Sequence, residues 1–215
     1  MHHNEINFEE KNKQLFNRWA RWYDAGINRI FFESIYRRTI SILKRERQAE
    51  LRRIACRFLD VACGTGEIIY RLAREFPETQ FDGVDFTTGM IKKAQEKTRA
   101  LHNVSFQEAD VAILPFPDNS FDVILCSDAF HHLPQPEIVL KEVNRILKKG
   151  GLFLLVDPAC EGLFPRLIFN NLFKWIEHAH HYYRRTELRK LFARHGFKVT
   201  DIFTYYFQNF LVSKK

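Results

Sequence analysis

Short apolar runs alternate with amphipathic segments of helical periodicity between residues 56 and 157. Such alternation is typical of βαβ units. It predicts strands at Arg57–Ala62, Gln80–Asp85, Val104–Glu108, Phe121–Cys126 and Leu152–Asp157, separated in part by helices at Glu67–Phe76, Gly89–Ala100 and Glu137–Lys148. The last helix leads into "KKGG", basic residues followed by glycine, which predicts a helix end at that point.

The pattern differs on both sides of this alternation. Apolar residues recur at helical spacing through residues 8–48, which predicts an N-terminal helical region. After residue 157, a long apolar helix is predicted at 163–179 and a second helix at 186–195. Two nearly contiguous strand-like runs, Phe197–Thr204 and Tyr206–Val212, then predict an antiparallel hairpin at the sheet edge.

These elements predict an α/β fold with a Rossmann-like, seven-stranded, mostly parallel sheet. The C-terminal hairpin is antiparallel, helices cover both faces, and an N-terminal helical lid precedes the sheet. A length of 215 residues suits one domain. Within it we expect a helical lid at 1–50, a cofactor-binding core at 56–157, substrate-side helices at 158–195 and the hairpin at 196–215.

Composition narrows the class of protein. Apolar residues make up 46% of the chain and aromatic residues 14%, which indicates a globular protein. No uninterrupted apolar run reaches the roughly 18 residues of a membrane span, and the first residues lack the apolar core of a secretory signal. The four cysteines form neither a CxxC pair nor a zinc pattern, so we expect reduced thiols in a cytoplasmic protein.

A formal net charge of +7 favours an anionic partner, either nucleic acid or a membrane surface. Much of the excess lies just before the first predicted strand, at Arg37, Arg38, Lys44, Arg45, Arg47, Arg52, Arg53 and Arg57. A solvated helix face is the simpler explanation of this cluster.

The stretch "FLDVACGTGEI", residues 58–68, leads from a predicted strand through two glycines into a predicted helix. A P-loop needs Lys and Ser or Thr after its second glycine, whereas Glu67 and Ile68 follow Gly66. The dinucleotide fingerprint needs a third glycine where this chain has Ile69. A carboxylate at position 67 would also repel a phosphate at the helix N-terminus. The turn therefore disfavours a phosphorylated nucleotide.

Asp85 ends the second predicted strand, about 20 residues past the turn, where a carboxylate accepts hydrogen bonds from ribose hydroxyls. Its alternative role is a strand-end turn or a helix cap. Backbone approach at Gly64 and Gly66, a ribose on Asp85, and nearby acids such as Asp60 together fit a cationic nucleoside without phosphates. S-adenosylmethionine combines these groups.

Four stretches carry a family resemblance: "LDVACGTGEI", "GVDFTTGMI", "QEADVAILPFPDNSFDVILCSDAFHHL" and "ILKKGGLFLLVDP". In order and spacing they resemble the class I S-adenosylmethionine-dependent methyltransferases, in the small-molecule branch that contains the ubiquinone/menaquinone C-methyltransferases. The resemblance covers residues 58–157. It implies transfer of a methyl group from S-adenosylmethionine, with S-adenosylhomocysteine as the product.

The resemblance also implies contacts to the amino-acid moiety, ribose, adenine and sulfur of the cofactor. In chain order these fall on Asp60, Ala62, Gly64, Gly66, Asp85, Phe86, Asp110, Val111 and Ser127. Cys63 lies in the same turn and is grouped with them, although no chemistry is assigned to its thiol. Tyr23 belongs to a "WYD" segment that resembles the one preceding the core in this branch, where the tyrosine closes over the cofactor.

Methyl transfer is an in-line displacement at an activated carbon, so the enzyme's main task is to position the nucleophile. A phenol, enol or ammonium nucleophile must also lose a proton. His131 and His132 follow the fourth predicted strand, at the sheet edge where ligands bind in open α/β folds, and histidine is the natural base near neutral pH. Asp128 is a second candidate. Capping of a short helix is the alternative role for either histidine.

The chemistry requires no metal, and we predict none. His178, His180 and His181 are close in sequence, but on one helix they would not point the same way.

The predicted helix at 163–179 carries a broader apolar stripe than packing on one face requires, although ordinary packing explains much of it. A lid over an apolar substrate, or a face that contacts an anionic membrane, is the sharper hypothesis. We therefore expect a small or lipid-like acceptor, such as a quinol or a phospholipid head group.

Two other functions compete. A nucleic-acid methyltransferase would fit the positive charge, but the segment after the fourth predicted strand reads "CSDAFHHL" rather than Asn/Asp-Pro-Pro-aromatic. Cys160 lacks the surroundings of a nucleophile, and the chain carries no appended RNA-binding module. A non-catalytic cofactor-binding protein is the other alternative. Neither the acceptor atom nor the oligomeric state follows from the sequence.

Overall fold

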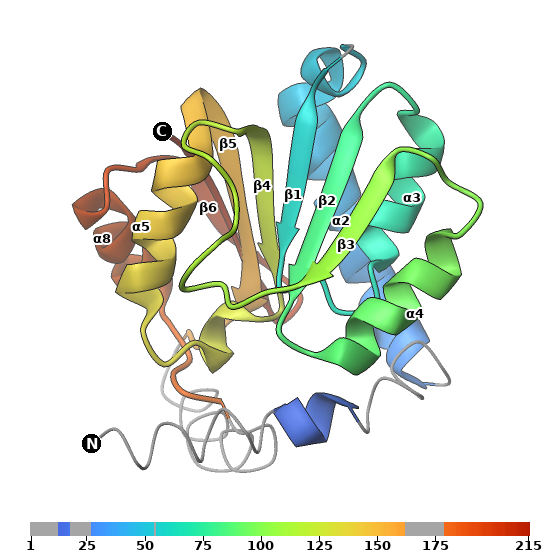
Figure 1. Ribbon diagram of the computed structural model, residues 1–215. Helices are drawn as coiled ribbons and strands as arrows, with labels where there is room; N and C mark the ends of the chain where they lie inside the picture. Colours follow the sequence, from blue (N-terminus) through green and yellow to red (C-terminus); the bar gives the residue numbers. More distant parts are fainter. Residues whose placement is uncertain (1–12, 18–26, 54, 162–178) are drawn as a thin grey trace.

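The computed structural model describes residues 13–17, 27–53, 55–161 and 179–215 (Figure 1). A short helical stretch at residues 13–17 precedes the main elements. These are, in chain order, α2 (Ile27–Leu51), β1 (Arg57–Val61), α3 (Glu67–Glu75), β2 (Gln80–Asp85), α4 (Thr88–Thr98), β3 (Val104–Glu108), β4 (Phe121–Ser127), η1 (Phe130–His132), α5 (Pro136–Ile146), β5 (Leu147–Pro158), α8 (Arg185–Arg194), β6 (Lys198–Tyr205) and β7 (Gln208–Lys214).

The sheet has seven strands in the order β3-β2-β1-β4-β5-β7-β6. The first five pair in parallel, whereas β7 is antiparallel to both β5 and β6. The predicted mostly parallel sheet with an antiparallel hairpin at one edge is therefore confirmed. The strand order reverses between β1 and β4, and in open α/β sheets ligands bind in the crevice at the carboxyl ends of the strands there.

Alternate residues of the central strands face two separate cores. Phe58, Phe81 and Val123 pack with apolar side chains of α2, α3 and α4 on one face. Leu59 and Ile124 point the other way and pack against α5 and α8. The central strands are thus buried on both faces, as is typical of parallel sheets covered by helices. All four cysteines are free thiols.

One predicted helix end is wrong. The "KKGG" sequence does not stop a helix, because α5 ends at Ile146 and residues 147–151 already belong to β5. Two long-range contacts hold this segment extended. Leu147 is the register partner of Phe121 on β4, and Gly150 donates its amide hydrogen to the carbonyl of Lys215 at the C-terminus. Sheet pairing therefore overrides the local helix-stop signal.

Part of the predicted lid and substrate side lies outside the described residues. This applies to Tyr23, to His178 and to nearly all of the predicted helix at 163–179. Across the ranges that the structure does describe, no helix is both long enough and apolar enough to cross a membrane.

Candidate functional site

A pocket of about 580 Å³ opens at the carboxyl ends of β1, β2 and β4. This is the topological switch point of the sheet, and the volume falls within the range of small-molecule sites. The lining comes from segments far apart in the sequence: the loop after β1, the end of β2, the loop after β3, the end of β4, and the short helical stretch at residues 13–17.

The loop after β1 turns sharply at its two glycines. Both have positive φ, +52° at Gly64 and +70° at Gly66, a conformation that other residues rarely adopt. A Cβ at Gly64 would meet nothing within 4 Å, so the backbone there is open to the pocket. A Cβ at Gly66 would lie 2.9 Å from the Phe106 ring. Gly64 thus leaves room for a ligand, whereas Gly66 lets the turn pack on β3.

Asp85 locks this loop to β2. One carboxylate oxygen accepts the Gly64 amide hydrogen (N···O 2.9 Å) and the other accepts that of Thr87 (2.9 Å). Burial raises the pKa of Asp85, while these two amides oppose the rise. Each carboxylate oxygen keeps a second lone pair, so the group can still accept a hydroxyl from the pocket side.

Asp60 is a buried acid that lines the pocket. Its Oδ1 has no hydrogen-bond partner among the described residues. Burial, and then the neighbouring charge of Asp85, hold its pKa well above the usual range. A buried, unsatisfied carboxylate is costly unless a ligand donates to it or carries positive charge. The arrangement therefore fits a cationic ligand and disfavours an anionic one.

The side of the pocket beyond β2 and β3 is lined by Phe86, Asp110 and Val111. Asp110 accepts the amide hydrogen of Ala112 at Oδ1 (2.8 Å), which fixes its carboxylate in the loop after β3. The Phe16 ring packs edge-on against Phe86, with 6.4 Å between centroids. Phe16 thereby brings the N-terminal helical stretch into the pocket wall.

The two adjacent histidines lie in different environments. His132 lines the pocket and packs edge-on against Phe16 (5.2 Å between centroids). His131 is 3% exposed, and its Nδ1 lies 2.9 Å from Oδ1 of the equally buried Asp157. The His131 ring also stacks on Tyr182 (5.2 Å). Of the two histidines, His132 is the one that lines the pocket.

Asp128 lies at the end of β4 in a strained conformation, with φ of +53°. Its Oδ1 accepts a hydrogen bond from Gln208 Nε2 (2.8 Å) at the start of β7. Asp128 and the preceding Ser127 both line the pocket.

The pocket brings together most of the residues singled out in the sequence. Those that line it are Asp60, Ala62, Cys63, Gly64, Asp85, Phe86, Asp110, Val111, Ser127, Asp128 and His132. Gly66 and His131 lie behind the lining, and Tyr23 lies outside the described residues. Cys63 is half-buried in the pocket wall, and desolvation holds the pKa of its thiol well above the usual range, which disfavours the reactive thiolate.

Sequence reasoning missed several residues of the site. The N-terminal region contributes Lys13, Phe16 and Tyr36 to the pocket lining. In the sequence these residues belong to a region of helical periodicity and carry no sign of a role in the site. Asp157 and Gln208 each hold a predicted residue from a distant strand. Asp157 could have been identified from the stretch "LLVDP", because an acid near the carboxyl end of a predicted strand lies close to the edge of the sheet where ligands bind.

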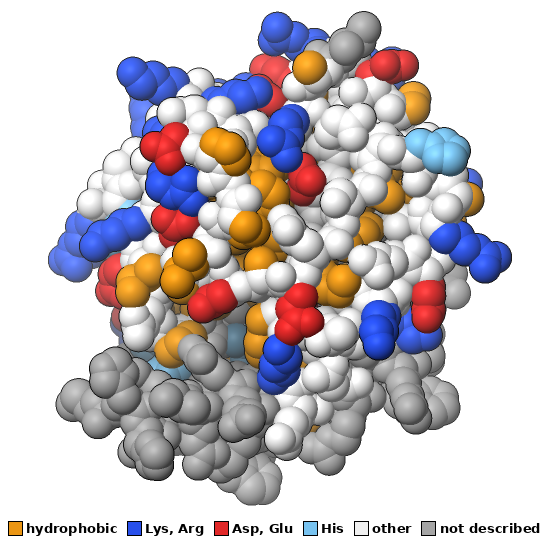
Figure 2. All heavy atoms as spheres, in the orientation of Figure 1, with side chains coloured by type: hydrophobic (Ala, Val, Ile, Leu, Met, Phe, Trp, Pro, Cys, Tyr) orange, Lys and Arg blue, Asp and Glu red, His pale blue; other side chains and the backbone are white. Residues whose placement is uncertain are grey.

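The basic cluster before β1 is largely paired. Ion pairs join Arg37 to Glu33, Lys44 to Glu75, Arg45 to Glu46, Arg47 to Glu50 and Arg57 to Asp82. On the face shown in Figure 2, Lys and Arg side chains are interspersed with Asp and Glu. In the described part of the chain, no three His, Cys, Asp or Glu side chains form a metal-binding group.

Comparisons with known proteins agree with this geometry. Residues 53–204 match a family model described as a methyltransferase domain. The demethylmenaquinone methyltransferase of Staphylococcus carnosus is 29% identical over 217 residues, which cover 90% of this chain and 88% of that protein. The enzyme of the same name from Staphylococcus aureus is 28% identical over 212 residues, 88% of this chain and 86% of its own.

Two solved structures share the fold. The YcgJ protein of Bacillus subtilis superposes with a TM-score of 0.65 at 28% identity, over 76% of this chain and 71% of that one. An S-adenosylmethionine-dependent methyltransferase from Aquifex aeolicus gives a TM-score of 0.63 at 20% identity, over 77% and 86% of the two chains.

Proposed function

This chain belongs to the S-adenosylmethionine-dependent methyltransferases, and from that premise we propose that it methylates an apolar acceptor of the quinol class. The observation that carries the proposal is the continuity of one pocket. Its acid-lined part lies at Gly64 and Asp85, and its more apolar part lies beside His132, at Leu133, Pro134 and Val139. The demethylmenaquinone methyltransferases that align with nearly the whole chain supply the acceptor class.

The pocket residues fit the methyl donor. Asp85 would accept the ribose hydroxyls, the open backbone at Gly64 would admit the amino-acid moiety, and the buried carboxylate of Asp60 would favour the positive charge of the ligand. Phe86 and Asp110, on the far side of the pocket, would border the adenine. S-adenosylmethionine, when bound, supplies a methyl group already activated by its sulfonium.

The acceptor side needs a base and a dry environment. A quinol becomes strongly nucleophilic when a hydroxyl proton leaves, because the negative charge spreads onto the neighbouring ring carbon. His132 is the group that takes this proton; after the transfer the methylated ring carbon loses its own hydrogen as a proton and the ring oxygen regains one, so that one proton is released overall. Asp128, held by Gln208, is the second acid–base group within the same part of the pocket. Leu133, Pro134 and Val139 exclude water from the ring.

The direct test is an assay with a methyl-labelled donor and a reduced, short-chain demethylmenaquinol. We expect label in the quinol and one S-adenosylhomocysteine formed per methyl transferred. The matched control is the corresponding menaquinol, whose ring carbon already carries the methyl group and which should stay unlabelled. Methyl transfer to an amine or to RNA, with none to the quinol, would overturn the assignment of the acceptor.

A quinol with a long prenyl chain resides in a membrane, so the proposal includes peripheral contact with an anionic bilayer. The net charge of +7 supports such contact, but ion pairs along α2 engage four of the eight basic residues of the cluster, Arg37, Lys44, Arg45 and Arg47. We therefore expect weak, salt-sensitive binding. Cosedimentation with anionic liposomes at low salt checks it; equal recovery with neutral liposomes would remove the electrostatic part of the proposal.

A further inference from the structure

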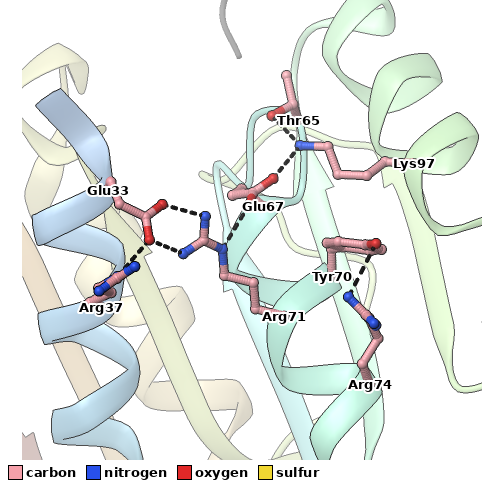
Figure 3. A network of polar contacts seen from close by, with 8 residues as sticks. All are labelled: Glu33, Arg37, Thr65, Glu67, Tyr70, Arg71, Arg74 and Lys97. Atoms are coloured by element: carbon pink, nitrogen blue, oxygen red, sulfur yellow. Dashed lines mark hydrogen bonds and ion pairs between the residues drawn. The ribbon is translucent and has the colours of Figure 1, made fainter. Parts of the chain in front are cut away.

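A chain of ion pairs connects the N-terminal helix to the cofactor loop (Figure 3). Glu33 on α2 faces Arg71 on α3, and Arg71 in turn contacts Glu67 at the start of the same helix. Lys97 on α4 bonds both Glu67 and Thr65 of the loop after β1. Three helices and one loop are thus joined by alternating charges.

The geometry at the centre of this network is specific. The two terminal nitrogens of Arg71 reach the two oxygens of Glu33, at 3.1 and 2.7 Å, which is the bidentate arrangement. The remaining Nε of Arg71 donates to Glu67 Oε1 (2.7 Å). Lys97 Nζ lies 2.8 Å from Glu67 Oε2. Both oxygens of each carboxylate therefore have a cationic partner.

These contacts are partly shielded from water. The side chains of Arg71, Glu33, Glu67 and Lys97 are 26%, 31%, 20% and 19% exposed, far less than the 78% of Arg37 at the margin. The Arg71 guanidinium, and then that of Arg37, lower the pKa of Glu33 to about 2, so the pair stays charged across the physiological range. Networks of partly buried, bidentate pairs contribute more than isolated surface pairs.

The network reaches the pocket through three side chains that line it: Thr65, Glu67 and Tyr36. The Arg71 guanidinium lies over the Tyr36 ring, 5.4 Å from its centroid. Arg71 is itself not part of the lining. It therefore touches two wall residues, Glu67 from α3 and Tyr36 from α2, without facing the ligand.

We propose that Arg71 is a positioning residue for the methyl donor, which holds Tyr36 and Glu67 in the pocket wall and makes docking of α2 a determinant of donor affinity. Arg71 satisfies the charge of Glu67, so that this carboxylate stays fixed beside the loop. Through Glu33 it holds α2 at the distance that keeps Tyr36 in the wall. The inference rests on the pocket being the donor site, as proposed above, and is independent of the acceptor.

The test compares two arginines of the same helix. Arg71→Met removes the network centre but keeps a long apolar side chain. Arg74→Met makes the same change at an exposed position, where the arginine donates a 3.4 Å hydrogen bond to the Tyr70 hydroxyl of its own helix and forms no ion pair with a described residue (Figure 3). Calorimetry gives the Kd for S-adenosylmethionine and S-adenosylhomocysteine, and denaturant unfolding gives the stability of each variant. Binding is measured well below the unfolding transition.

We expect Arg71→Met to raise the Kd for both ligands about tenfold, and Arg74→Met to leave it within about twofold of the wild type. Arg71→Lys keeps the charge but loses the bidentate fork, so its Kd should fall between the two. A Tyr36→Ala variant should weaken binding by itself, and the Tyr36→Ala/Arg71→Met double variant should be little weaker than either single one.

A purely structural role for Arg71 predicts something else: lower stability with an unchanged Kd, which would overturn the inference. Additive losses in the double variant would overturn the part played by Tyr36. If Arg71→Met does not fold, Arg71→Lys and Glu33→Gln carry the same comparison against Arg74→Met. Absence of donor binding by the wild-type chain would instead refute the donor site itself.

Discussion

The two halves of the pocket are built in different ways. The proposed donor half, at the ends of β1 and β2, takes its main residues from two short stretches, 60–66 and 85–87, which bond directly to each other through Asp85 and Gly64. The proposed acceptor half, at the end of β4 and η1, depends on strands that come later in the chain. Asp157 of β5 holds His131, and Gln208 of β7 holds Asp128.

Each half also contains a buried carboxylate with a raised pKa, but the two face different surroundings. Asp60 lines the pocket, and its Oδ1 lacks a partner among the described residues. Asp157 lies behind the lining; its Oδ1 accepts hydrogen bonds from the amides of Phe130 and His131 and from the His131 ring, while its Oδ2 also lacks a partner among the described residues. The first acid is placed to respond to a ligand; the second fixes the segment that carries His132.

One half is thus built from a local turn and the acid that holds it, while the other places His132 and Asp128 in the wall through contacts from distant strands. Substitutions in the donor half should therefore change affinity, and substitutions at the pocket-facing side chain of the acceptor half should change turnover. The following variants separate these effects.

The largest effect is expected at His132. His132→Gln removes the proposed base while keeping a polar side chain, so kcat for quinol methylation should fall about 10²- to 10⁴-fold. The Kd for S-adenosylmethionine should stay within about twofold, because the donor half is untouched. Steady-state kinetics and calorimetry measure the two quantities. His102→Gln, at an exposed position away from the pocket, is the matched control; a kcat for His132→Gln equal to that of the control would exclude His132 as the base.

Asp85→Ala should produce the opposite pattern. The change removes the acceptor for the ribose hydroxyls and releases the amides of Gly64 and Thr87. Hydrogen bonds to a charged group contribute about 1.5–3 kcal/mol each, so the Kd for the donor should rise about 100-fold or more. Calorimetry with S-adenosylhomocysteine checks this prediction. A variant that remains folded by circular dichroism and binds normally would show that the ribose lies elsewhere.

The same contrast explains what could be predicted from the sequence. The donor half was accessible because its chemistry lies within contiguous motifs: the glycine turn, and the acid at position 85 that follows it at a fixed spacing. The strands were predicted from the short apolar runs. Their parallel or antiparallel pairing followed from whether a helix or a tight turn connects them. The helix stop at "KKGG" failed because pairing of Leu147 with Phe121, a contact between distant positions, decided the local conformation.

The acceptor half was predictable only in part. The pair His131–His132 was identified, but nothing in the local sequence distinguishes the residue that faces the pocket from the one that is buried. That distinction comes from Asp157 and Tyr182, which reach His131 only after β5 and the chain beyond it have packed. The contribution of Phe16 and Tyr36 was hidden for the same reason, because it depends on where the N-terminal region docks.

The two glycines of the donor half provide a smaller, purely structural comparison. Gly66→Ala should lower the free energy of unfolding by roughly 2–4 kcal/mol, because the positive φ is unfavourable for alanine and the new methyl would lie 2.9 Å from Phe106. Gly64→Ala should cost roughly 1–2 kcal/mol, from φ alone. Its methyl projects into open space in the pocket and should weaken donor binding.

Denaturant unfolding and calorimetry measure both effects in each glycine variant. Equal losses of stability at the two positions would contradict the different packing described for them.

The smallest expected effect is a difference in pH dependence between Asp60 and Asp157. Burial raises the pKa of both carboxyls above the unfolded-state value near 3.8, so the folded state binds more protons than the unfolded state above that pH. Their stabilising contribution is complete below about pH 4 and is lost as the pH rises through the folded-state pKa, with a slope of at most about 1.4 kcal/mol per pH unit for each group. Asp60→Asn and Asp157→Asn should therefore each flatten the fall in unfolding free energy as the pH rises above about 4, measured by denaturant titration.

The donor separates the two acids. A cationic ligand favours the ionised form of Asp60, so binding of S-adenosylmethionine should release protons and tighten as the pH rises, whereas Asp157 faces no ligand and should add nothing to this release. Calorimetry in buffers of different ionisation enthalpy counts the protons. We expect Asp60→Asn to reduce the proton release and Asp157→Asn to preserve it. If the two variants release the same number of protons, the charge of the cofactor does not change the ionisation of Asp60. The two buried carboxylates would then differ in their hydrogen bonds but not in their response to the donor.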